Sequence, residues 1–207
     1  YDSPVNLVSS VTWSPTEENA TTVQATTETL NFAEEEQELP NPEEKPLNSI
    51  GRYDDLGELG VGGMGEVRKI RDRTLNRTLA MKIIHQKMLT KHNVTARFIE
   101  EAQIGAQLQH PNIVPIHEMG RLNDGRLYFT MKEVRGRPFG EAIDEVHQAV
   151  GNDRWQIAKS GWSFRRLVDA FNDVCKAVAY AHSKGVLHRD LKPENIVLGE
   201  YGEVLVV

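Results

Sequence analysis

The chain has 207 residues, a net charge of −6 and one cysteine, Cys175. One cysteine excludes an internal disulfide and fits a reducing compartment, so a cytoplasmic location is the default expectation. The sequence contains no apolar run of the ~18 residues that indicate a membrane-spanning helix. We expect neither a membrane segment in this stretch nor a nucleic-acid partner.

The negative charge is concentrated in the first quarter of the chain. Residues 1–50 hold ten acidic residues and one lysine, whereas residues 51–207 hold 20 acidic and 23 basic residues. The first segment is rich in Thr, Glu and Pro and has no apolar period, so it cannot bury enough surface to offset chain entropy. It is predicted to be a disordered acidic linker. Two further roles stay open: its threonines accept phosphate, or its acidic run folds back onto the basic part.

Residues 51–134 have the pattern of a small sheet with one helix. Three strands are predicted between Tyr53 and Ile84, joined by a glycine turn at residues 60–65 and a polar turn near Asn76. A helix is predicted from about Val94 to Gln109, where a His-Pro pair ends it. Strands at residues 113–119 and 127–134 flank an Asn-Asp-Gly turn. The fold class is therefore α+β, with a five-stranded antiparallel sheet.

Residues 135–207 are predicted to be mainly helical. One helix is expected over residues 139–150, and after a polar loop a second begins with Ser163 as N-cap and ends before Gly185. Residues 196–198 and 204–207 are expected to form a hairpin. Because Cys175 falls in the apolar stripe of the long helix, we interpret it as a core residue without a catalytic role. The members of that stripe are Phe164, Leu167, Val168, Phe171, Val174, Cys175 and Val178.

The glycine turn is the first candidate binding element. A G-x-G-x-x-G spacing is weak evidence by itself, since dinucleotide-binding folds use it to open a helix. Here polar and apolar residues alternate after Gly65, which favours a strand. A turn of this kind between antiparallel strands can lie over phosphates, because backbone N–H groups approach them closely. Gly60, Gly62 and Gly65 would form the flap; an ordinary flexible hairpin is the alternative.

Lys82 is a lysine in an otherwise apolar strand. An ammonium on the inner face of a sheet needs an anionic partner, because an unpaired buried charge is costly. In the following helix, Phe98, Glu101, Gly105 and Leu108 share one face. We therefore predict a Lys82–Glu101 ion pair, with two solvated surface residues as the alternative.

The segment His188–Asn195 places a carboxylate, an ammonium and a carboxamide in one short loop, the set that phosphoryl transfer to a hydroxyl requires. Together with Gly60–Val67 and Ala80–Lys82, this loop resembles the glycine loop, strand lysine and catalytic loop of eukaryotic-type (Hanks-type) protein kinases. Lys-Pro-Glu at residues 192–194 resembles the serine/threonine branch, and the short spacing is similar to bacterial members. The resemblance covers residues 53–207.

This resemblance implies a bilobal kinase fold, with an N-lobe at residues 51–134 and part of a C-lobe at residues 135–207. It implies ATP and Mg²⁺ as cofactors and a protein substrate with a Ser or Thr acceptor. Asp190 would accept or orient the hydroxyl proton, Lys192 would neutralise the transferred group, Asn195 would bind Mg²⁺, and Lys82 with Glu101 would hold the phosphates. The implied nucleotide-binding residues are Gly60, Val61, Gly62, Gly63, Gly65, Val67, Ala80, Lys82, Met131, Lys132, Val134 and Val197.

Other parts of the family pattern lead to further expectations. His188 would support the loop from within the core, and Arg189 would pair with a phosphorylated activation segment or hold loop carbonyls. The family continues with a D-F-G aspartate, which is not found by Val207. We therefore expect the 207-residue polypeptide to have negligible kinase activity and to aggregate or stay partly molten. The alternatives to a serine/threonine kinase are a nucleotide-binding pseudokinase that acts as a scaffold and a small-molecule kinase of related fold.

Overall fold

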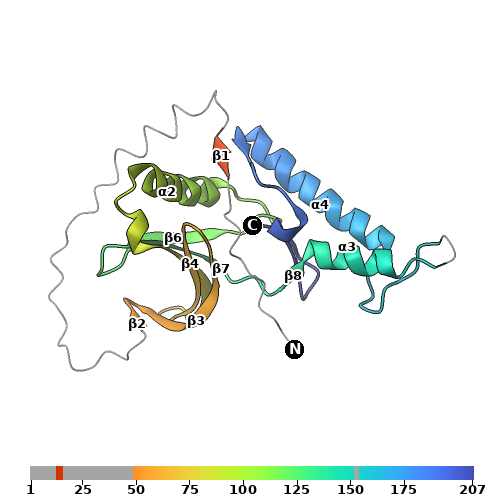
Figure 1. The fold of residues 1–207 in the computed structure, drawn as a ribbon, viewed down its shortest axis with the longest axis horizontal. Helices are drawn as coiled ribbons and strands as arrows, with labels where there is room; N and C mark the ends of the chain where they lie inside the picture. The colour runs from red at the N-terminus through yellow and green to blue at the C-terminus, as the bar shows by residue number, and fades with distance from the viewer. Residues whose placement is uncertain (1–12, 16–48, 152–153) are drawn as a thin grey trace.

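A computed structural model describes residues 13–15, 49–151 and 154–207. Between residues 49 and 132, six strands form one antiparallel sheet in the order β2-β3-β4-β5-β7-β6 (Figure 1). The sequence predicts five of these strands, and the sixth is the two-residue β2, which pairs with the start of β3. The strands are β2 (Ser49–Ile50), β3 (Tyr53–Val61), β4 (Gly65–Asp72), β5 (Arg77–Ile84), β6 (Ile116–Arg121) and β7 (Leu127–Lys132).

Both faces of the sheet are covered along β5, which explains why this strand is almost continuously apolar. Side chains alternate across a strand. Ala80 and Ile84 therefore pack in the inner core with Phe98 of the helix, whereas Met81 and Ile83 pack in a smaller outer cluster. Lys82 falls in register with the inner set, so the sheet directs its ammonium to the helix side.

The inner face is covered by α2 (His92–Gln107), which follows the short 3₁₀ turn η3 (Gln86–Met88). The observed helix begins and ends two residues earlier than predicted. All four members of the predicted face, Phe98, Glu101, Gly105 and Leu108, are buried.

The second part of the chain has two helices and a three-stranded sheet in the order β11-β10-β8. The predicted N-cap is confirmed, since Ser163 Oγ accepts the backbone N–H of Arg166. Gly185 has a φ of 71°, the left-handed geometry expected after a helix end. The elements are β8 (Gly136–Pro138), α3 (Phe139–Gln148), α4 (Phe164–Ser183), β9 (Val186–Leu187), η4 (Pro193–Asn195), β10 (Ile196–Gly199) and β11 (Val204–Val206).

The prediction that Cys175 is a core residue is wrong, because the structure exposes it. The apolar arc of α4 is wider than the surface that covers it. The side that includes Leu167 and Val174 packs in the core with Val204 and Val206 of the hairpin, whereas the side that includes Val168 and Phe171 is 49% and 58% exposed. Helical periodicity identifies residues that share a side, but it does not show how much of that side is covered.

The prediction of a disordered linker over residues 1–50 is wrong at both described places. Ser49–Ile50 form β2, and Ser14–Pro15 form β1, which pairs with β9. Trp13 is only 3% exposed. A buried tryptophan removes enough apolar area from water to fix a short segment that has no repeating pattern of its own. The other residues of the predicted linker lie outside the described part of the chain.

Of the helices that the structure describes, none is long and apolar enough to cross a lipid bilayer.

Candidate active site

The predicted ion pair between Lys82 and Glu101 is confirmed. The Lys82 Nζ atom donates to Glu101 Oε1 at 2.6 Å, and both side chains are more than 90% buried. Burial raises the pKa of the Glu101 carboxyl above its ordinary value, and the Lys82 ammonium counteracts only part of this effect. The pair therefore holds a fixed positive group at the boundary between β5 and α2.

The glycine turn joins two antiparallel strands, as expected. Gly60 pairs with Val67 and Val61 with Glu66, and the Gly62 N–H donates to the Gly65 carbonyl at 2.8 Å. Gly65 is required by a close approach of two backbones, because a Cβ there would lie 2.2 Å from the Ile83 carbonyl oxygen. Gly63 meets no such limit, since a Cβ at this position has nothing within 4 Å.

The apolar residues assigned to the adenine site are brought together in one cluster. The sheet contributes Val67 of β4 and Ala80 of β5, and β10 contributes Val197 from the second part of the chain. Met131 and Val134 complete the set. The structure thus forms a buried apolar layer between the sheet and the β10–β11 hairpin, which is the kind of surface that binds a planar base.

The connection after β7 offers backbone groups beside this layer. The Lys132 N–H is already bonded to the Pro115 carbonyl at 3.1 Å, so a bond from Lys132 to an adenine would use its carbonyl oxygen. Two ion pairs hold the connection: Lys69–Glu133 at 2.6 Å and Lys132–Glu203 at 3.3 Å. Sequence reasoning missed both pairs, because their partners lie far apart in the chain.

The three polar residues of the catalytic loop lie in contact. Lys192 Nζ is 3.0 Å from Asp190 Oδ2, and Asn195 Nδ2 donates to the same oxygen at 3.1 Å and to the Asp190 carbonyl at 2.7 Å. The hydrogen bond from Lys192 is the main reason why the pKa of Asp190 lies below its ordinary value, and Asn195 adds to the effect. Asp190 is therefore an ionised acceptor at neutral pH.

Asn195 also meets a test for metal binding. It is fully buried, and its Oδ1 has no hydrogen-bond partner among the described residues. An unpaired buried amide oxygen is costly, and amide and carboxylate oxygens are the ligands that Mg²⁺ prefers. The Nδ2 bonds to Asp190 fix the orientation of the amide, so the free oxygen is held in place. Asn195 therefore offers one oxygen of the kind that Mg²⁺ binds, while the described residues contain no group of three or more His, Cys, Asp or Glu side chains that could hold a metal by themselves.

The catalytic loop is joined to the cleft through the last strand. Val207 donates its N–H to the Asn195 carbonyl at 3.0 Å, and its own carbonyl oxygen lies 3.0 Å from His188 Nε2. His188 is 5% exposed, which confirms the prediction that it supports the loop from within the core. Arg189 is exposed, and no described contact tests its predicted regulatory role.

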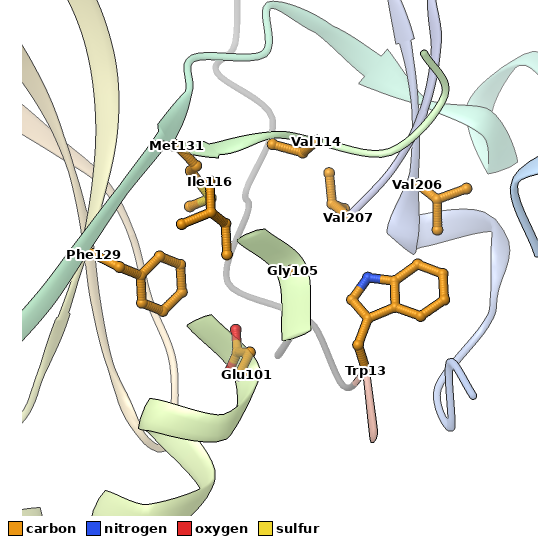
Figure 2. Close-up of a pocket in the computed structure, with 9 residues that line it drawn as sticks. All are labelled: Trp13, Glu101, Gly105, Val114, Ile116, Phe129, Met131, Val206 and Val207. Carbon is orange, nitrogen blue, oxygen red and sulfur yellow. The ribbon is translucent and has the colours of Figure 1, made fainter. Parts of the chain in front are cut away.

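A small cavity lies behind the ion pair, and Trp13 forms one wall of it. Figure 2 shows the Trp13 indole beside Val206 and Val207, with Glu101 and Gly105 of α2 on the next side. The ring of Trp13 meets the ring of His188 edge-on, with centroids 4.5 Å apart. Sequence reasoning missed this contact entirely. The other lining residues are Val114, Ile116, Phe129 and Met131.

Comparisons with known proteins agree with this geometry. Residues 53–207 match the family model described as "Protein kinase domain". The chain is 41% identical over 155 residues to the serine/threonine-protein kinase PknD of Protochlamydia amoebophila and 38% identical over 157 residues to PknD of Chlamydia trachomatis. Each alignment covers 75% of this chain and 16% of the relative. The chain thus spans about one sixth of the length of these curated relatives.

Solved structures show the same fold. The kinase domain of Mycobacterium tuberculosis PknI, in its C20A mutant, superposes with a TM-score of 0.58 at 26% sequence identity. The match covers 76% of this chain and 59% of that one. The chain therefore belongs to the protein kinase family, which generally uses ATP and Mg²⁺. The curated relatives that it matches are named as serine/threonine-protein kinases of bacteria, the branch that its catalytic-loop motif resembles.

Proposed function

We propose that this chain supplies the ATP cleft and the catalytic loop of a protein serine/threonine kinase. The observation that carries this proposal is the buried Lys82–Glu101 pair, which lies at the edge of an apolar layer that could take adenine. A buried ammonium that is held by one carboxylate is costly for stability and useful as a preorganised phosphate contact.

Each charged residue of the cleft has a distinct role in the proposed reaction. Lys82 holds the α and β phosphates, and Glu101 orients its ammonium. The oxygen of a substrate Ser or Thr attacks the γ phosphorus, the bond to the β–γ bridging oxygen breaks, and ADP leaves. Asp190 orients the attacking hydroxyl and receives its proton, while Lys192 neutralises charge on the transferred group.

Asn195 would hold a Mg²⁺ ion through its free Oδ1, and the bound ion would neutralise the phosphate charge. The low pKa of Asp190 supports a role in orienting the hydroxyl and taking its proton late, since a weakly basic carboxylate is a poor base for a neutral alcohol. Preorganised charges and substrate position then account for most of the rate enhancement.

The proposal is tested on the intact protein, by which we mean a longer form that contains this chain and a D-F-G segment. It is incubated with Mg²⁺ and ATP labelled at the γ position, together with a mixed Ser/Thr peptide substrate. We expect label on Ser or Thr, and a loss of at least ~10²-fold in the Asp190→Ala variant with ATP binding retained. Asp144→Ala, an exposed aspartate on α3, is the matched control and should leave the rate unchanged. ATP binding without transfer by the wild type would favour the pseudokinase alternative.

A further inference from the structure

The side chain of His85 is bonded to the glycine turn. His85 directly follows β5, three residues after Lys82, and its Nε2 lies 3.0 Å from the Gly62 carbonyl oxygen. Its backbone N–H donates to the Met64 carbonyl at 3.0 Å. One residue therefore holds two carbonyl groups at the tip of the turn.

The alternation of side chains along β5 indicates on which side of the sheet the His85 contacts lie. Along β5, Ala80 and Ile84 pack on the inner face and Met81 and Ile83 on the outer one. Continued one residue past the end of the strand, this alternation would place the His85 side chain on the outer face, remote from Lys82. A carbonyl oxygen carries partial negative charge, whereas a backbone N–H attracts phosphate. A turn that lies over phosphates therefore binds them better when its carbonyls are held outward.

We propose that His85 is a positioning residue for the triphosphate: it donates a hydrogen bond to the Gly62 carbonyl and thereby fixes the glycine turn in the orientation that accepts phosphate. This inference rests on the proposed function, because it takes the cleft to bind ATP. Both the neutral tautomer with a proton on Nε2 and the protonated ring can donate this bond. Without this donor, the peptide group that carries the Gly62 carbonyl is free to rotate. ATP binding must then restore its orientation, which weakens the affinity for ATP.

The chain offers a graded set of variants for the test. His85→Leu removes the donor at similar side-chain size, and His85→Gln retains an N–H donor at about the same distance from the backbone. His92→Leu makes the same chemical change at an exposed histidine that begins α2. All three are made in the intact protein, where affinities for ATP, ADP and adenosine and the kcat and KM for ATP are measured.

We expect His85→Leu to raise the Kd and KM for ATP by about five-fold, the usual effect of one lost hydrogen bond, with kcat changed less than two-fold. Adenosine should bind equally well to all variants, because the turn contacts phosphate and not the base. His85→Gln should restore most of the ATP affinity. Amide hydrogen exchange at Gly62–Met64 should be faster in His85→Leu and close to the wild-type rate in His85→Gln.

Three outcomes would overturn the inference. ATP affinity of His85→Leu equal to that of His92→Leu would show that the bond has no role. A parallel loss of adenosine affinity would show a general effect on the fold. If His85→Gln binds ATP as weakly as His85→Leu, a hydrogen bond donated by residue 85 is excluded as the cause. If His85→Leu does not fold, the ATP affinity of His85→Gln alone decides the question. If the wild type itself binds no ATP, the proposed function fails as well.

Discussion

At the scale of single residues, the cleft contains a buried ion pair that adds little to the stability of the fold but fixes the position of a charge. Lys82 and Glu101 are both buried, and a buried ion pair seldom stabilises a fold more than apolar residues of the same size would. The raised pKa of Glu101 shows that the carboxylate is incompletely compensated. In the proposed reaction, the Glu101 carboxylate holds the Lys82 ammonium at one position before a ligand binds. The ammonium then does not have to reorganise during the reaction.

The pH dependence of activity should report the contact between Lys192 and Asp190. Asp190 must be ionised to accept a proton, so activity falls as the pH drops through its pKa, which Lys192 lowers. Lys192→Met removes the main cause of this lowering, so the acidic limb of kcat/KM should move to higher pH. The measurement is kcat/KM against pH, from acidic conditions below the ordinary pKa of an aspartate up to neutral pH.

Glu194→Gln is the control for this experiment, because it changes the charge of the same loop at an exposed side chain. Its acidic limb should shift only slightly. A Lys192→Met profile with the wild-type midpoint, or with a midpoint at lower pH, would contradict the assignment of Asp190 as the titrating group.

The site residues that could be predicted from the sequence stand out from the pattern of their own strand or helix. Lys82 interrupts an apolar strand, and Glu101 interrupts the apolar face of a helix, so their pairing follows from local patterns. His85 gives no such signal, since it lies just past the end of β5 and reaches Gly62 only when the hairpin closes. The free Oδ1 of Asn195 was likewise visible only in three dimensions.

At the scale of elements, the geometry of the glycine hairpin depends on a close backbone approach between β4 and β5. A side chain at Gly65 would strike the neighbouring strand at the Ile83 carbonyl, whereas one at Gly63 would meet open space. The same contact joins the turn to the strand that carries Lys82. The geometry of the flap and that of the lysine are therefore coupled through β4 and β5.

Gly65→Ala and Gly63→Ala should differ sharply although both add one methyl group. The Gly65→Ala methyl group meets backbone at 2.2 Å, so β4 and β5 must separate, which should destabilise the protein by roughly 1–3 kcal/mol and weaken ATP binding. The Gly63→Ala methyl group meets open space and should change both quantities little. Denaturant unfolding and ATP titration provide the measurements, and equal effects of the two substitutions would contradict the structure.

Element types and order were predictable because strands and helices have different apolar periods. How much of a helix surface is covered by neighbouring elements could not be predicted in this way. The helix α4 has apolar residues over about half of its circumference, and only the side packed on the hairpin and α3 is buried. The wrong placement of Cys175 follows from this difference.

At the scale of the whole molecule, the cleft depends on contacts between segments that are distant in sequence. Val206 bonds through its N–H to the Asn112 carbonyl, and Trp13 packs between α2 and the catalytic loop. Local patterns could not predict either contact, since each depends on how the parts of the chain come together. The sheet, the helices and the loop motif were nevertheless sufficient to predict the family.

The uncovered side of α4 should govern the behaviour of the 207-residue polypeptide in solution. Exposed apolar patches promote association, and Phe164, Val168 and Phe171 are each about half exposed. We expect this polypeptide to self-associate and to bind a hydrophobic dye. The double variant Val168→Lys with Phe171→Lys should reduce both effects while its circular dichroism remains unchanged. A monodisperse wild type that binds no dye, measured by light scattering and fluorescence, would contradict this.

The most direct test of the account is the ATP turnover of Lys82→Met in the intact protein, compared with Lys87→Met at an exposed lysine of η3. The fold should survive Lys82→Met, because Glu101, whose pKa burial already raises, can become protonated once the ammonium is gone. Phosphoryl transfer should fall by at least ~10²-fold in Lys82→Met and remain unchanged in Lys87→Met. Wild-type turnover by a folded Lys82→Met variant would contradict the central claim that this buried ammonium holds the phosphates of ATP.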